Sequence, residues 1–221
     1  MYNFFIKTAA PTVWIICGIE LILLIYLVYK SIKSKSLFIY LVTAITFGLL
    51  YDSFITSLGT VIDASNIMFL SRLRFILHSS LVPLLFIISE EALNPKKQIK
   101  IAIVITTLVL ITIGLVSIIF TKYSVIDFAG ISRLTVNKEE TAKIVTKIPT
   151  IINIVSIIPL IGIGIYILIK EKNIHLLLAG LLMFLFSAIG PIIKLTDFIF
   201  LISMFGEVLM IVFLILYRIK K

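Results

Sequence analysis

Six ionisable side chains lie inside stretches that are otherwise apolar, and these are the residues of the chain best suited to chemistry. A charge at the centre of a bilayer costs about 2.5 to 3.5 kcal/mol on insertion scales, so each such group needs a partner or water. Carboxylates, guanidinium groups and an imidazole around one wet cavity could bind a polar or anionic solute, hold a cation or move protons. The six residues are Glu20, Asp52, Arg72, Arg74, His78 and Glu207.

Helical spacing assigns these residues to faces, because residues three and four apart lie on the same side of a helix. Arg74 and His78 share a face, which we expect to line a cavity, whereas Arg72 lies on another face and would reach the outer headgroups. We expect Asp52 to point inward, because a carboxylate facing lipid would be costlier. The predicted ligand-binding residues are Glu20, Asp52, Arg74, His78 and Glu207, with Arg72, Tyr51, Ser71 and Ser203 as secondary candidates.

A dry, structural interpretation competes with this cavity. In it, Arg74 pairs with Asp52 or Glu207, and such pairs join helices without any ligand. Counting from the helix ends at 1.5 Å per residue places all six groups within a slab roughly 10 Å thick in the outer half of the membrane. Three carboxylates, two arginines and a histidine at one level favour a hydrated cavity over a set of dry pairs.

The elements that position these groups follow from composition. The chain is 61% hydrophobic and 14% charged, whereas soluble domains are about 45–50% apolar and about 25% charged. Its apolar runs are continuous rather than alternating, which predicts membrane-spanning helices of roughly 20 residues and not barrel strands. The prediction is an all-α, polytopic integral membrane protein, with residues 1–221 forming a single seven-transmembrane-helix bundle. The predicted spans are 11–30, 37–58, 67–89, 99–120, 149–170, 174–194 and 198–218.

The net charge of +9 is distributed by side of the membrane. Lysine-rich turns alternate with the short acidic turns GTVIDASN and LTDF, so the positive-inside rule places the N terminus outside and the C terminus in the cytoplasm. We therefore expect a prokaryotic plasma membrane protein in contact with anionic membrane lipids, and no nucleic acid partner. A homo-oligomer or a cytoplasmic partner stays open.

One connection, residues 121–148, is long and falls on the outer side. Because loops of that length without structure are uncommon, we predict a short surface helix over NKEETAKIVTKI, residues 137–148. A plain surface loop and a lid over the cavity are the two interpretations. The halves flanking this region begin alike, at Pro11 and Pro149. This suggests a three-plus-one-plus-three (3+1+3) repeat, although chance similarity between Ile- and Leu-rich helices is the alternative.

Recognisable enzyme and metal motifs are absent from the sequence. It contains no GxxxxGK[ST], HExxH or GxSxG, and its two histidines and single cysteine, Cys17, predict no metal site and no cofactor. We lean against an enzyme. A lipid-modifying intramembrane enzyme remains an alternative, with His78 or a carboxylate as general base and the arginines holding a headgroup.

The first hypothesis is a small-solute carrier or receptor with an outward-facing polar pocket for a small polar or anionic ligand. Its architecture resembles that of the three-plus-one-plus-three sugar and vitamin carriers and of opsins, but the last helix holds no internal lysine for a retinal linkage. The stretch YDSFIT followed by RLRFILHSSLVPLLFII resembles the second and third helices of the seven-helix input regions in front of bacterial signalling kinases. That resemblance implies a second alternative, a sensor module that works with a separate signalling partner.

Overall fold

The chain is mostly helical in a computed structural model that describes residues 2–93, 95–192 and 198–219. Six helical segments in this part are long and apolar enough to cross a membrane, which suggests an integral membrane protein. A further apolar helix, α7 (His175–Ile192), is shorter. The six are α1 (Tyr2–Ser34), α2 (Leu37–Leu58), the α3–η1–α4 run (Met68–Leu81, Val82–Leu84, Leu85–Leu93), α5 (Lys97–Ile119), α6 (Lys143–Glu171) and α8 (Ile199–Ile219).

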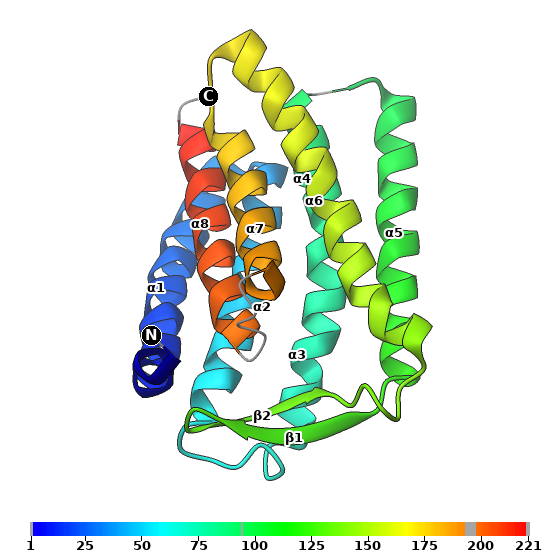
Figure 1. The fold of residues 1–221 in the computed structure, drawn as a ribbon. Coiled ribbons are helices and arrows are strands. Elements are labelled where there is room, and N and C mark those ends of the chain that lie inside the picture. Colours follow the sequence, from blue (N-terminus) through cyan, green and yellow to red (C-terminus); the bar gives the residue numbers. More distant parts are fainter. Residues whose placement is uncertain (1, 94, 193–197, 220–221) are drawn as a thin grey trace.

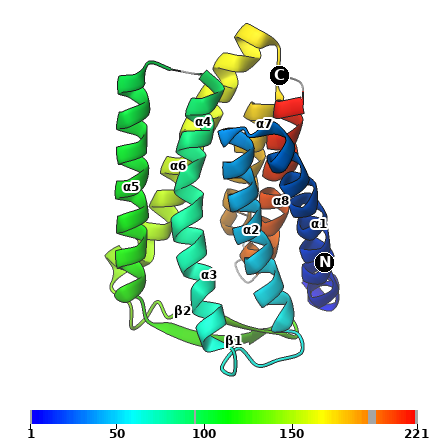
Figure 2. The same cartoon turned by 180° about the vertical axis from the view of Figure 1, so that it is seen from behind.

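The helices lie side by side and roughly along one direction (Figures 1 and 2). α1, α2, α7 and α8 form one group, α5 lies at the opposite edge, and α3, α4 and α6 lie between them. α1 starts near the end crossed by two strands, and α8 finishes near the other end. The predicted acidic turn LTDF falls mostly outside the described residues.

The long connection forms a β-hairpin rather than a surface helix. β1 (Tyr123–Phe128) and β2 (Ile131–Val136) pair antiparallel, with Phe128 opposite Ile131. The two loop residues, Ala129 and Gly130, have φ of 53° and 74°, which is the backbone of the tight turn that suits twisted hairpins. The predicted helix over residues 137–148 is wrong, because helix starts only at Lys143 and continues as α6. The strict all-α prediction is corrected accordingly.

The hairpin is fastened across one end of the bundle (Figure 1). The Ser132 amide donates to the Gly59 carbonyl at 2.8 Å, and the Ala64 amide donates to the Ser132 hydroxyl at 3.1 Å. A Cβ on Gly59 would lie 2.0 Å from the Ser132 carbonyl oxygen, so only glycine allows this approach. Ile131, fully buried, packs with residues of α1 and α8. These contacts hold β2 over the ends of three helices.

Two backbone features shape the interior. Pro83 lies in the 3₁₀ turn that interrupts the third span, on the side of His78 away from the hairpin. Proline has no backbone N–H to donate, so a break in the α-helix is expected there. Gly164 permits close contact between α6 and α7, because a Cβ there would lie 2.5 Å from the Leu177 Cα. The larger apolar core fills the half of the bundle away from the hairpin and includes Leu27, Leu85 and Leu214.

Candidate functional site

A polar cavity of about 200 Å³ lies between the helices at the end of the bundle that the hairpin crosses. We call it the hairpin-end cavity. Its lining comes from α2, α3, α6, α7, α8 and β2, so segments far apart in sequence meet there. Five of the predicted residues line it: Asp52, Arg74, His78, Ser203 and Glu207. Four further polar residues line it too: Thr56, Arg133, Asn153 and Ser187.

Arg74 and Asp52 form the charged wall of this cavity. The Arg74 Nε donates to Asp52 Oδ1 at 2.8 Å, and its Nη1 donates to the Thr56 hydroxyl at 3.1 Å. The side chains are 11% and 25% exposed. They are thus shielded enough for strong attraction yet still reachable by a small solute. The face that Asp52 shares with Thr56 points inward, as the cost of a lipid-facing carboxylate predicts.

Arg133 of the hairpin adds a second guanidinium group to the cavity lining. It projects from β2 into the cavity lining, and its Cζ lies 3.9 Å from the centre of the Phe200 ring on α8. A guanidinium group this close to an aromatic ring is attracted by the negative face of the ring. The hairpin thereby brings a cation to the mouth of the cavity.

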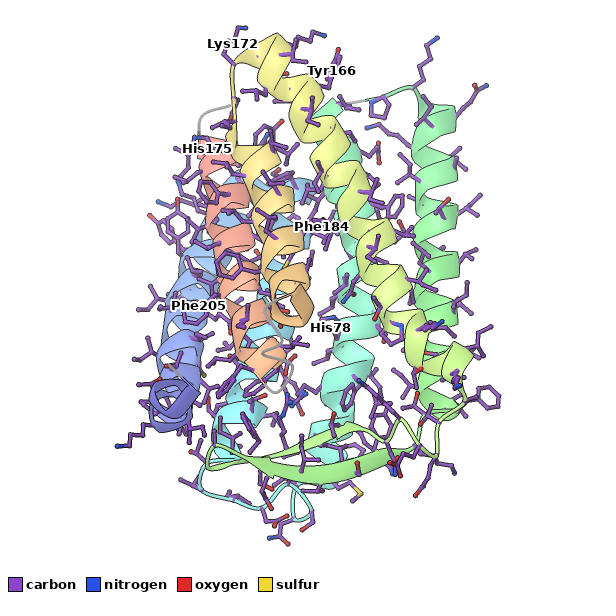
Figure 3. All side chains as sticks on the ribbon, viewed as in Figure 1. His78, Tyr166, Lys172, His175, Phe184 and Phe205 are labelled. Atoms are coloured by element: carbon purple, nitrogen blue, oxygen red, sulfur yellow. The ribbon has the colours of Figure 1, made fainter. Side chains whose placement is uncertain are left out.

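The deep end of the cavity holds His78, Asn153 and Glu207. Figure 3 shows His78 in the space between α3 and α7, and Asn153 of α6 is its polar neighbour. Glu207 on α8 is only 6% exposed. Beyond these groups the lining turns apolar, with side chains such as Leu85 and Met210. The polar cavity is therefore closed toward the opposite end of the bundle.

Glu20 does not line the hairpin-end cavity, although it was predicted to. Its carboxylate lies next to α2, where the Ser53 hydroxyl donates to Oε2. The second oxygen, Oε1, is buried without a hydrogen-bond partner among the described residues. Glu20 is nevertheless near enough to Asp52 and Glu207 to interact with both electrostatically.

Three secondary candidates also lie outside the cavity. Tyr51 donates its hydroxyl to the Leu70 carbonyl at 3.0 Å, and Ser71 is buried. Arg72 is exposed, with its guanidinium carbon 5.8 Å from the centre of the Tyr123 ring on β1. Burial raises the pKa of the Tyr123 phenol, which keeps it neutral, so Arg72 meets a ring face rather than an anion.

The described side chains include no group of three or more His, Cys, Asp or Glu residues that could hold a metal ion. Comparison with protein-family models finds no match, and comparison with curated proteins finds none.

The sequence did not single out Arg133, because residues 121–148 were expected to form a surface loop or lid that ends in a short helix, with no strand in it. A signal was present, however. YSVIDF and ISRLTV are both rich in β-branched and aromatic residues, and only Ala-Gly separates them, which is the pattern of a tight hairpin. A hairpin of that length returns across the bundle and can carry a side chain over its centre.

Proposed function

We propose that this chain is a membrane carrier or receptor that binds a small polar or anionic solute in the hairpin-end cavity. The observation behind the proposal is that two guanidinium groups, Arg74 and Arg133, line one cavity together with the imidazole of His78. Planar guanidinium groups recognise carboxylate and phosphate oxygens by paired hydrogen bonds. Asn153, Ser187 and Ser203 supply further polar contacts for a small solute.

The proposal includes a membrane topology. α7 would act as the seventh span, with the N terminus and hairpin outside and the C terminus in the cytoplasm of a prokaryotic cell. Its support is the grouping of lysine-rich turns at the end opposite the hairpin. In this orientation the cavity opens toward the outer solution, and the hairpin lies across the solute's entry route.

A carrier and a receptor would differ in how they use the apolar layer around Leu85 and Met210, which closes the cavity on the side away from the hairpin. A carrier must open that layer to release its solute inward, whereas a receptor can keep it closed and pass on a shift of the hairpin or helices. Lipid chemistry is less well supported than either, because Asp52 already accepts the Arg74 guanidinium and is therefore a poor general base.

Thermal unfolding of the purified protein tests the proposal. Carboxylates, phosphate esters, amino acids and sugars are added singly, and one class should raise the melting temperature. A solute at 100 times its Kd adds about 2.7 kcal/mol to the unfolding free energy. Arg74→Gln and Arg133→Gln should each abolish this shift relative to the variant's own baseline, while the matched control Arg72→Gln keeps it.

The proposal fails if no class stabilises the protein, or if Arg72→Gln weakens the shift as much as Arg74→Gln does. Uptake of the stabilising solute by proteoliposomes then separates the two roles. A carrier accumulates the solute inside the vesicles, whereas a receptor binds it without uptake.

A further inference from the structure

A second cavity, of about 300 Å³, lies at the end of the bundle opposite the hairpin. It is formed where α1 and α8 end and α2 begins, and we call it the lysine-end cavity. Lys30 and Arg218 line it, together with Tyr26 and the end of α1 at Ser34. None of the described residues that line it is acidic. The described part of its wall thus presents two cations and no carboxylate.

Aromatic residues mark the level of this cavity in the membrane. Three tyrosines stand four residues before a lysine at the same end of the bundle: Tyr26 with Lys30, Tyr29 with Lys33, and Tyr166 with Lys170. Figure 3 shows Tyr166 and Lys172 at this end. Tyrosine rings gather at the headgroup level of a bilayer, and lysines extend their amines toward it. The lysine-end cavity therefore lies where lipid phosphates are.

The cations of this cavity differ from Lys100 in their acidic neighbours. Lys100 lies 3.7 and 3.8 Å from the carboxylates of Glu90 and Glu91. Lys30 instead lies with its Nζ 5.6 Å from the centre of the Tyr26 ring, and Arg218 is exposed. Both remain able to attract an external anion.

The remaining wall is apolar. Leu27, Ile39 and Ile215 form its buried side, and Ile219, 60% exposed, lies at its rim. A cavity with cations beside apolar walls, open at the bundle surface, matches a molecule that carries a phosphate and hydrocarbon together. A free inorganic anion would gain nothing from the apolar part.

We propose that the lysine-end cavity binds the headgroup phosphate of an anionic phospholipid between α1 and α8. Lys30 and Arg218 face the phosphate, and the first acyl carbons lie along the apolar rim. Basic pockets between membrane helices are a recurrent way to hold such headgroups. This site is independent of the hairpin-end cavity and of the function proposed for it.

Native mass spectrometry of the delipidated full-length protein tests the site. Phosphatidylglycerol should bind with one tight lipid per chain, and phosphatidylcholine should bind far more weakly. The double variant Lys30→Gln/Arg218→Gln should lose at least roughly tenfold in phosphatidylglycerol affinity. The matched control Lys33→Gln/Lys170→Gln removes two charges at the same end but outside the cavity, and it should keep the affinity.

Three results would overturn the proposal: equal losses in the two double variants, equal binding of phosphatidylcholine, or displacement of the lipid by inorganic phosphate, which would mean a site for small anions. The charge-retaining variant Lys30→Arg/Arg218→Lys guards against misfolding. It should bind phosphatidylglycerol like the original chain, and loss of binding in this variant would also refute the role of charge.

Discussion

Arg74 and Asp52 show how this chain tolerates charge among apolar residues. Each is costly in hydrocarbon, but their contact at 2.8 Å, with Thr56 as a third partner, offsets much of the cost. An ion pair alone would satisfy the structural interpretation. The cavity beside it, which also holds Arg133, His78 and Glu207, is larger than a simple pair requires.

A double-mutant cycle separates these two interpretations. Arg74→Gln or Asp52→Asn should each lower the unfolding free energy by about 2–3 kcal/mol, less than the 3–5 of a fully buried pair because Asp52 is partly exposed. The double variant should recover part of that stability, since neither charge is left alone. Thermal unfolding measures both effects.

Solute binding completes this test. The double variant should regain stability but not the solute-dependent shift, because the guanidinium group is gone. If the double variant binds the solute normally, the pair serves only to join α2 to α3. Single variants as stable as the original chain would contradict the ion pair itself.

Glu20 offers a second test at this scale. Ser53→Ala removes the hydroxyl that donates to its carboxylate and should cost about 1–3 kcal/mol, the range for a buried group left without its partner. Glu20→Gln in the same chain should reduce that cost, because a neutral amide is easier to bury. Thr43→Ala is the control, since Thr43 bonds only its own helix at the Ile39 carbonyl. A Thr43→Ala loss as large as the Ser53→Ala loss would contradict this account.

At the scale of elements, the apolar runs of the sequence can be compared with the helices. The second span was predicted at 37–58, which are the bounds of α2. α1 and α6 begin earlier than predicted, at Tyr2 and Lys143, because a helix does not have to stop where the strictly apolar segment ends. The hairpin was missed because its strands are only six residues long, and a search for bilayer-length runs passes over them.

The contact between α6 and α7 can be tested with two glycines. Gly164→Ala should destabilise the protein by about 1–3 kcal/mol, because the new methyl group would clash with the Leu177 backbone. Gly162→Ala is the matched control. Its Cβ meets nothing within 4 Å, and alanine is the better helix former by about 1 kcal/mol. Thermal unfolding should show a lower melting temperature for the first variant alone, and equal losses would contradict the close contact.

At the scale of the whole molecule, the two ends carry different chemistry. The hairpin end holds a cavity of mixed charge, and the opposite end holds tyrosine–lysine pairs and a cationic cavity. Counting residues from the helix ends predicted that Asp52, Arg74, His78 and Glu207 lie at one level. It could not tell that Glu20 accepts from Ser53 and stays out of the cavity lining, because helix rotation depends on packing partners that one sequence does not reveal.

Cysteine labelling shows whether the hairpin-end cavity is wet and reachable from the solution. Cys17→Ala removes the single cysteine, and one cysteine is then placed at Ser203, in the cavity lining, or at Ser89, fully buried in the core. The protein in nanodiscs is treated with a charged thiosulfonate. Ser203→Cys should react much faster than Ser89→Cys and be protected by the stabilising solute. Equally slow labelling at both positions would mean a dry cavity and contradict the account.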